Sequence, residues 1–408
     1  MYCGIDWASA HHDVAVVDDD GRIVVRGRVG NDAAGFAQLL TLLAEAGDSA
    51  DDPIPVAIET DRGLWVAALR ETGRAIYPIN PLAASRYRAR YAVSGAKSDA
   101  TDAVLLANIL RTDRAAHRLL PADTELAQVI RVLARAQQDA VWARQQIGNQ
   151  IRDLLKDFYP AAIVAFAELP SGGLARADAR TILAAAPTPA QAATLTPARL
   201  RRLLAKAGRR RDLDRDVARL REVFTDTYLH QPPQVETAMG IQLAALLRQF
   251  DAAATAADEL AQAVTAHFER HPDAQIIVSF PGLGNLAGAR VLAEIGDDRA
   301  RFADARGLKA FAGSAPITRA SGKKTVVLHR HIKNQRLAAV GSIWALSSLR
   351  SSPGARRHFD TRRAAGDWNR QAQRHLFNKF LGQLHHCLHT GQLYDEHRAF
   401  PPPLPLAA

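Results

Sequence analysis

The sequence predicts an α/β domain at the N-terminus followed by a long α-helical region, a fold class of α/β plus α. Three observations predict this class. β-Branched residues gather in three short runs within residues 1–30. Predicted helices and strands then alternate over residues 31–112, as they do in α/β folds. Over residues 123–165, apolar side chains recur every three to four residues, which is the period of a helix.

The first three elements are predicted strands, with the sequences YCGIDWA, HDVAVVD and RIVVRGRV. They are separated by Ser9–His11 and by the turn Asp18–Gly21, and such breaks are typical of hairpins. The elements that follow are a helix over 31–46 with Asn31 as its cap, a strand over 53–59, a helix over 63–72, a strand over 74–78, and helices over 81–91 and 98–112. Three meandering strands followed by alternating helices and strands is the order of an RNase H-like fold.

The middle of the chain, residues 121–270, is predicted to be helical without strands. A helix over 123–165 cannot bury its apolar stripe on itself. We therefore expect a coiled-coil-like pairing with a second helix, in the same chain or in another copy. Residues 170–200 are rich in Ala, Pro and Thr and predict a connection or insertion. The basic segment 199–221 fits either a solvated helix with internal ion pairs or a DNA contact.

A second, mostly helical domain is predicted to begin near residue 271. The segment 276–297 predicts a strand or loop, then the glycine loop Pro281–Gly284, and then a helix. After it come the glycine-broken segment FAGSAPITRASGKK, a short strand TVVLHRH, and helices over 334–349 and 367–389. The predicted domains are a nuclease domain over 1–120, a helical spacer over 121–270, a serine-containing domain over 271–365, and a helix with a frayed tail over 366–408.

Composition excludes several classes of protein. The two cysteines are too few for a disulfide framework or a thiolate zinc cage. No apolar run is long enough to span a bilayer, and the start lacks a signal peptide, so we expect a cytoplasmic protein with no membrane partner. The net charge of +10 favours a polyanionic partner. Arg306–Arg336 contains no acid, and phosphate is the natural counter-charge for such a stretch.

Four carboxylates form the first candidate site. Asp6 lies in the first predicted strand, and Glu59 ends the fourth, which lies beside the first in this fold. Asp99 and Asp102 stand three residues apart at the start of a predicted helix, so both face one way. Each acid alone also fits a strand end, the surface or a helix N-terminus. Together they predict a site for hard divalent cations, which take oxygen ligands and assist phosphoryl transfer.

A serine in the acid-free stretch is the second candidate. Ser321 precedes a glycine and is followed by Lys323 and Lys324, whose charge could stabilise a pentavalent phosphate transition state. A turn serine in a phosphate-binding loop explains the same residues. Ser314 is a rival nucleophile without flanking cations.

The glycine loop before a helix, with Gly282 and Gly284, allows backbone N–H groups to approach a phosphate and is similar to a helix-hairpin-helix element. As a lone pattern it is weakly specific. The side chains expected to contact nucleic acid are all cationic and lie in the same acid-free stretch. They are Arg319, Lys323, Lys324, Arg330, Lys333 and Arg336.

These motifs together resemble the DEDD transposases of the insertion-sequence one-ten family and the related Piv-type DNA invertases. The resemblance is carried, in order, by GIDWAS, AIET, KSDATDA, PGLGNLAGARVLAEIGD, FAGSAPITRASGKK and HRHIKNQRL. It covers nearly the whole chain, as a RuvC-like domain, a helical spacer and a transposase domain. Two differences are the sequence Gly313–Pro316, where the family usually has Gly-Leu-x-Pro, and the lack of a glycine after the lysine of HIKNQRL.

The resemblance implies a transposase or site-specific DNA recombinase that acts at the nucleoid. The family's four acids map onto Asp6, Glu59, Asp99 and Asp102, which would bind Mg²⁺. Its serine maps onto Ser321, which would attack DNA and form a covalent 5′-phosphoserine intermediate. The resemblance also implies a guide RNA, the bridge RNA, that pairs with donor and target DNA. It further implies a homo-oligomer, a dimer or tetramer.

Three other functions fit parts of the sequence. A RuvC-like structure-specific endonuclease would share the four acids but use water as its nucleophile, and would not need Ser321. A sugar-kinase-like ATPase has a similar first strand but needs further glycine-rich phosphate loops, which do not occur where expected. A non-catalytic nucleic-acid-binding protein would need no buried carboxylates.

Overall fold

The computed structural model describes residues 1–91, 99–166, 173–322 and 324–401, and the side chains of 89–100 lie outside the description. The chain divides into two compact units. The first contains Met1–Asp123 with Asp298–Ala303, and the second contains Thr124–Asp297 with Asp304–Ala408. The α/β class is confirmed for the first unit, and the second is mostly helical.

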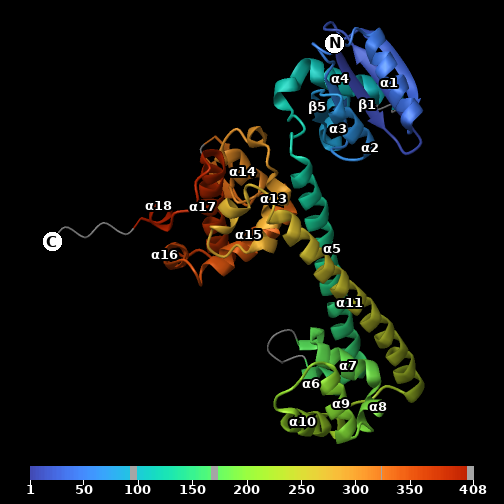
Figure 1. The fold of residues 1–408 in the computed structure, drawn as a ribbon, viewed down its shortest axis with the longest axis vertical. Coiled ribbons are helices and arrows are strands. Elements are labelled where there is room, and N and C mark those ends of the chain that lie inside the picture. The colour runs from blue at the N-terminus through green and yellow to red at the C-terminus, as the bar shows by residue number, and fades with distance from the viewer. Residues whose placement is uncertain (92–98, 167–172, 323, 402–408) are drawn as a thin grey trace, which may run out of the picture. The chain divides into compact units, whose positions relative to one another are not determined.

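The first unit is built on one five-stranded sheet, drawn in blue in Figure 1. Its strands are β1 (Tyr2–Trp7), β2 (His11–Val17), β3 (Ile23–Gly30), β4 (Val56–Ile58) and β5 (Ile76–Pro78). They lie in the order β3-β2-β1-β4-β5. The first three strands are antiparallel, and β4 and β5 continue the sheet in parallel with β1. The predicted succession of a meander and then alternating helices and strands is confirmed.

Helices cover both faces of this sheet. They are α1 (Ala33–Glu45), α2 (Leu64–Glu71), α3 (Pro81–Tyr91), α4 (Asp99–Asp113) and the short η1 (Arg114–Ala116). On one face, Cys3 and Ile5 of β1 share a core with Leu39 of α1. On the other face, Ala57 of β4 shares a core with Leu106 of α4. Side chains of a strand alternate between the two faces of a sheet. Gly4 and Asp6 therefore belong to the face that α4 covers.

Two details of the first unit differ from the sequence prediction. The cap of α1 is Asp32, whose carboxylate accepts a hydrogen bond of 2.7 Å from the backbone N–H of Gly35. Asn31 instead donates a hydrogen bond to the Ser9 carbonyl and lies 3.2 Å from the His12 ring. The fourth strand is also shorter than predicted, because only three residues pair with both neighbours.

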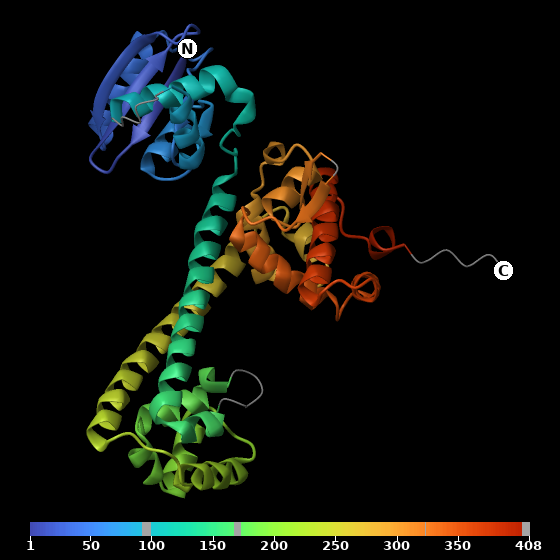
Figure 2. The same ribbon diagram turned by 180° about the vertical axis from the view of Figure 1, so that it is seen from behind.

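The second unit contains two long helices, α5 (Glu125–Phe158) and α11 (Pro233–Phe268), which lie side by side in Figures 1 and 2. The predicted pairing of the first long helix is therefore confirmed, and its partner lies in the same chain. The helix predicted to reach residue 165 ends at Phe158, before Pro160. A proline lacks the N–H that a helix needs and disfavours helical geometry in the residue before it.

A cluster of short helices closes the loop between these two long ones. They are α6 (Pro160–Phe166), η2 (Gly173–Ala175), α7 (Ala177–Ala185), α8 (Pro189–Ala193), α9 (Pro197–Lys206) and α10 (Leu213–Thr225). Of the two alternatives predicted for 170–200, a structureless connection is wrong, because the described residues from 173 onward form helices, whereas an insertion between α5 and α11 fits. Thr188 and Thr196 accept capping hydrogen bonds at the starts of α8 and α9, and both helices begin with proline. Thr and Pro therefore act as helix starts here, and alanines fill the core.

The basic segment 199–221 forms α9 and α10. Arg201 pairs with Asp214, and Arg209 pairs with Asp216. These internal ion pairs favour the interpretation of this segment as a solvated helical surface.

The rest of the second unit packs around aromatic residues. Its elements are α12 (Ala274–Val278), α13 (Asn285–Ile295), α14 (Ala305–Phe311), β6 (Ile317–Ser321), β7 (Lys324–Leu328), α15 (Gln335–Ser348), α16 (Pro353–Ala364), α17 (Asn369–Thr390) and α18 (Glu396–Ala399). Trp344 of α15 stacks on Phe380 of α17 with ring centroids 5.0 Å apart. Residues 274–278 are helical rather than extended, and the sequence predicts neither β6 nor α16 nor α18.

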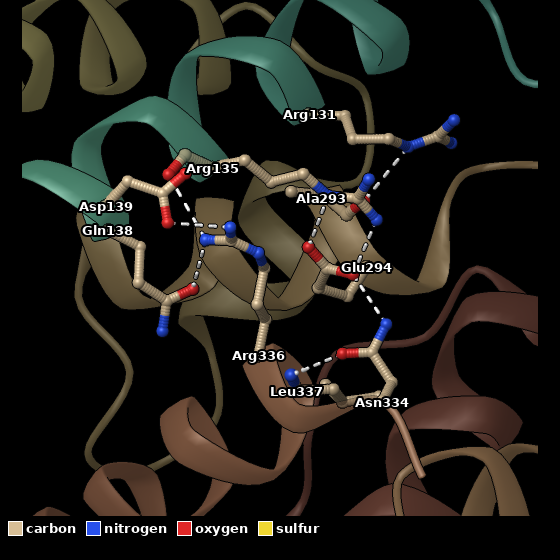
Figure 3. A network of polar contacts seen from close by, with 9 residues as sticks. All are labelled: Arg131, Arg135, Gln138, Asp139, Ala293, Glu294, Asn334, Arg336 and Leu337. Atoms are coloured by element: carbon tan, nitrogen blue, oxygen red, sulfur yellow. Dashed lines mark hydrogen bonds and ion pairs between the residues drawn. The ribbon is translucent and has the colours of Figure 1, made fainter. Parts of the chain in front are cut away.

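A buried carboxylate joins three helices of the second unit, as Figure 3 shows. Glu294 of α13 is 2% exposed and accepts hydrogen bonds from Arg135 of α5, at 2.8 and 2.9 Å. It also accepts one of 2.6 Å from Asn334, the cap of α15. Burial by itself raises the pKa of Glu294, but these hydrogen bonds outweigh it and the pKa lies below its ordinary value. The carboxylate therefore stays ionised and holds α5, α13 and the start of α15 together.

Among the described helices, none combines the length and apolar character that crossing a membrane requires.

Candidate functional site

Asp6 lies near the end of β1, and Glu59 directly follows β4, the strand beside it. β1 pairs with β4 so that Ile5 stands beside Ile58. The residues that follow, Asp6 and Glu59, are therefore level with each other. Both side chains are half-buried. Asp6 is two residues after Gly4, and Glu59 is two residues after Ala57. By strand alternation Asp6 lies on the face that α4 covers, and Glu59 directly follows the last residue of β4.

Asp102 comes from the helix on that same face. It is 4% exposed, and its Oδ1 accepts hydrogen bonds from Arg88 Nε at 3.0 Å and Nη2 at 2.7 Å. Arg88 lies on α3, so this ion pair ties α3 to the first turn of α4. Asp99, three residues earlier, begins α4, but its side chain lies outside the described part of the chain.

Gly4 explains why the helix can come so close to the strand. A Cβ on Gly4 would lie 2.0 Å from the carbonyl oxygen of Ala103 and 2.5 Å from the backbone N of Ala107. Only a residue without a side chain permits this contact between two backbones. Because Ala103 follows Asp102 directly, the contact brings Asp102 to the level of β1.

Gly4→Ala is expected to destabilise the first unit by about 3 kcal/mol, because a backbone cannot move aside as a side chain can. The measurement is chemical denaturation of the full chain, with hydrogen exchange in β1 and α4. Gly27→Ala is the matched control on the same sheet. Its new Cβ would meet only the end of the Leu42 side chain, at 2.9 Å, which can rotate away. An equal loss of stability in Gly4→Ala and Gly27→Ala would contradict this explanation of the contact between α4 and β1.

The donor chemistry of the acid face suits a hard cation. Asp6, Glu59 and Asp102 supply only carboxylate oxygens, which are the ligands that Mg²⁺ prefers. However, within residues 1–91, 99–166, 173–322 and 324–401, no three His, Cys, Asp or Glu side chains form a group that could hold a metal ion. Asp6 and Asp102 therefore lie on the α4 side of the sheet and Glu59 lies directly after β4, while a closed set of ligands is not formed by the described residues.

Ser321 ends β6 and lies at the tip of an exposed hairpin. It pairs with Lys324 of β7, and Gly322 has a left-handed φ of 55° that suits a tight turn. Ser321 and Lys324 are both exposed. Cross-strand partners point to the same face, as do residues two apart, so Arg319 and Lys324 share a face with Ser321. Lys323 lies outside the described residues.

Other predicted contact residues divide into two groups. Arg330 lies 3.4 Å from the Ala315 carbonyl, and Lys333 lies 3.1 Å from the His329 ring, both near the foot of the hairpin. Arg336 instead binds within the protein. It donates a hydrogen bond of 2.7 Å to Asp139 and another to the Arg135 carbonyl (Figure 3). Its guanidinium therefore helps α15 pack on α5.

The two loop glycines also differ. A Cβ on Gly282 would lie 2.5 Å from the backbone N of Ser348, and its φ is 82°, so packing against α15 requires a glycine there. Around Gly284, the cap of α13, no heavy atom of the described residues lies within 4 Å of such a Cβ. Only Gly284 is therefore open to a ligand.

Ser314, the rival nucleophile, is a packing residue. It is 5% exposed, and its hydroxyl lies 3.2 Å from the Lys309 carbonyl and 2.9 Å from Oδ1 of Asn378. This hydroxyl is held by protein acceptors, whereas Ser321 is open to solvent.

One feature of the second unit escapes sequence reasoning. A pocket of about 760 Å³ lies beside the foot of the hairpin and is lined by His329, Lys333, Trp368 and Arg374, among others. Its cations are Lys333 of the β7–α15 connection and Arg370 and Arg374 of α17, which follow 37 and 41 residues later in the chain. The only signal in the sequence is the tryptophan beside the arginines of the segment DWNRQAQR.

Two transposase families match the chain. A family described as transposase matches residues 3–160, and one described as the IS116/IS110/IS902 family of transposases matches residues 274–360. The candidate transposase of the IS117 mini-circle from Streptomyces coelicolor is 60% identical over 408 residues. This comparison covers 100% of the chain and 98% of that protein. The chain belongs to the IS110 family of transposases.

More distant proteins of insertion elements are also similar to this IS110-family transposase. The uncharacterized 42 kDa protein of IS900 from Mycobacterium paratuberculosis is 28% identical, over 97% of each chain. The uncharacterized 43.6 kDa protein of IS110 from Streptomyces coelicolor is 27% identical, over 89% of this chain and 85% of its own. The first matched family spans the four predicted acids, and the second spans Ser321. The resemblance noted in the sequence is therefore confirmed at the level of the family.

Proposed function

We propose that this IS110-family transposase is a site-specific DNA recombinase that cuts and rejoins strands through a covalent serine intermediate. The proposal is supported by the register of β1 and β4, which brings Asp6 level with Glu59, and by the close contact of α4, which carries Asp102, with β1. The strand order β3-β2-β1-β4-β5, with three antiparallel strands and two parallel ones, supports an RNase H-like, RuvC-like domain. In that fold such an arrangement of acids is the natural place for phosphoryl-transfer chemistry.

Asp6, Glu59, Asp99 and Asp102 would hold Mg²⁺. When bound, the ion stabilises charge on the attacking and leaving oxygens of a phosphoryl transfer. The protein's part is to hold the carboxylates in place. Arg88 uses only Oδ1 of Asp102, so its second oxygen is not taken by this ion pair. The contact at Gly4 keeps α4 against the strand that carries Asp6.

Ser321 would attack the phosphorus of the cut phosphodiester. A bond forms between Oγ and phosphorus, the bond to the 3′ oxygen breaks, and the phosphate stays on the 5′ end as a phosphoserine. The serine loses one proton and the leaving 3′ oxygen gains one. Arg319 and Lys324 lie on the same face of the hairpin and can stabilise the negative charge of the transition state. Attack by another 3′ hydroxyl reverses the step and joins the strands.

The same proposal assigns parts and partners. The four domains remain those over 1–120, 121–270, 271–365 and 366–408, with the paired helices α5 and α11 as the spacer. The substrates are donor and target DNA, guided by a bridge RNA, in a dimer or tetramer that acts in the cytoplasm at the nucleoid. The acid-free stretch 306–336 supports a polyanionic partner.

The test uses the purified full chain with circular DNA carrying the element's ends and RNA transcribed from the flanking region. The relative from IS117 is named for a mini-circle, which makes circular DNA the form to try first. We expect joined products and a protein–DNA adduct with Mg²⁺, and neither with excess EDTA. Cleavage without any adduct would instead indicate a nuclease that uses water.

A further inference from the structure

The pocket at the foot of the hairpin has an unusual lining. It lies within the second unit, between the connection that follows β7, α15 and the start of α17. Its volume is about 760 Å³. Three basic side chains and one histidine line it together with large apolar ones. The lining residues used below are His329, Lys333, Ile343, Leu346, Trp368 and Arg374.

The charge of this pocket is positive and unbalanced. Lys333 Nζ lies 3.1 Å from Nε2 of His329, and Arg374 Nη1 lies 3.1 Å from its Nδ1. Burial and the two cations lower the pKa of His329, so the ring is neutral. A neutral imidazole has one acceptor nitrogen and one N–H, so only one of the two cations can donate to it. Among the described lining residues there is no Asp or Glu, so the lining favours an anion.

Part of the lining is apolar and exposed. Trp368 is 81% exposed, Leu346 is 57% exposed and Ile343 is 50% exposed. Large apolar side chains that remain open beside cations mark a binding surface. An aromatic face next to cations is the arrangement that binds an unpaired nucleotide, because the base stacks on the ring and the phosphate meets the charge.

The position of the pocket links it to Ser321. The strands of the hairpin start and end beside it, since Gly313 and His329 both line it and Ile317 pairs with Leu328. Ser321 is four residues along the strand from Ile317, which is about 13 Å at the rise of a β-strand. A DNA strand attacked by Ser321 would therefore pass the pocket within a few nucleotides of the cut.

We propose that this pocket holds one unpaired nucleotide of the DNA strand that Ser321 attacks. The phosphate binds Lys333 and Arg374, and the base stacks on Trp368. Held in this way, the strand is positioned at a fixed distance from the serine. This inference rests on the proposed function for the identity of the strand, but the binding itself can be measured without catalysis.

The first experiment measures binding of a labelled single-stranded DNA and of the RNA of the same sequence, in EDTA, by fluorescence anisotropy with the full chain. Trp368→Ala is expected to weaken DNA binding about tenfold, which is the usual effect of removing one base–aromatic stack. Arg374→Gln is expected to weaken it and to lower the salt dependence by about one phosphate contact. Wild-type affinity in both variants would overturn the proposal. So would a loss confined to RNA.

Control variants remove the same groups elsewhere in the second unit. Arg356→Gln loses one positive charge, but Arg356 already pairs with Asp360 at 2.8 Å. Leu229→Ala removes an apolar side chain that is 91% exposed. Both are expected to bind DNA within about twofold of wild type. Equal losses in the controls would mean that any change of surface weakens binding, and would overturn the assignment of the pocket.

The second experiment locates the nucleotide. Abasic sites are placed one at a time along the strand. An abasic site at one position within a few nucleotides of the cut is expected to weaken binding to the wild type but not to Trp368→Ala. The reason is that the missing base and the missing ring belong to the same stacking contact. Loss at every position, or the same loss in the variant, would overturn the proposal. Ser321→Ala should bind DNA with wild-type affinity. The pocket can therefore be tested by binding even if no covalent adduct forms, so failure of the proposed function and failure of this inference can be told apart.

Discussion

Replacing Ser321 with alanine is expected to abolish both strand joining and the covalent protein–DNA adduct. The hydroxyl lies at the tip of an exposed hairpin, so its removal costs no packing and should leave the fold unchanged. Without the Ser321 hydroxyl the proposed attack on DNA has no nucleophile. We expect a rate of strand joining at least about a thousandfold lower. The measurements are recombination of circular DNA and the yield of adduct on a denaturing gel, with DNA binding as the check on folding.

Ser314→Ala is the matched control for this prediction. It removes the same hydroxyl seven residues away, in a residue that lines the pocket but is only 5% exposed, with its hydroxyl close to Asn378 and the Lys309 carbonyl. We expect this variant to lose about 1 kcal/mol of stability and to keep forming the adduct. An adduct that persists in Ser321→Ala would contradict the assignment. One that disappears in a folded Ser314→Ala would do so as well.

Asp6→Asn is expected to stop strand cleavage with little effect on folding. Asparagine keeps the shape of the side chain but removes the charge that a divalent cation requires, and such cations bind through charged oxygens. We expect a loss of about a hundredfold or more in cleavage. Calorimetric titration with Mg²⁺ should show weaker binding, which a purely structural role would not produce.

Asp13→Asn is the control for the loss of charge. Asp13 of β2 is the cross-strand partner of Asp6 and points to the same face, but Arg28 binds both of its oxygens, at 3.1 and 2.9 Å. Its replacement should lower stability slightly, because Arg28 is 56% exposed and can be solvated, and should leave cleavage intact. If both variants cleaved DNA equally well, Asp6 would not belong to the catalytic set.

Much of the candidate site can be predicted because its residues lie in regular elements. The alternation of β1 indicates that Asp6 and Cys3 point to opposite faces, and the order of elements indicates that β4 lies beside β1. The ion pair of Arg88 with Asp102 could not be foreseen, because the two residues come from different helices whose packing no local pattern encodes.

The cations of the acid-free stretch 306–336 also could not be told apart from the sequence alone. Lys324, Arg330, Lys333 and Arg336 look alike in the sequence, since each is a cation without a nearby acid. In the folded chain Arg336 reaches Asp139, almost 200 residues away, while Lys333 lines the open pocket. A residue's neighbours in space, rather than in sequence, decide whether its charge is free for phosphate.

The sequence by itself determined the strands of the first unit and the long helix α5, and it pointed to the four acids and the serine of the proposed function, because periodicity and short motifs act over a few residues. Only the tertiary structure decided that α5 pairs with α11 of the same chain, that Ser314 is buried, and that Gly282 serves packing. It also decided that Lys333 and Arg374 meet beside Trp368. These outcomes depend on contacts between distant segments, where burial and close approach of backbones outweigh local preference.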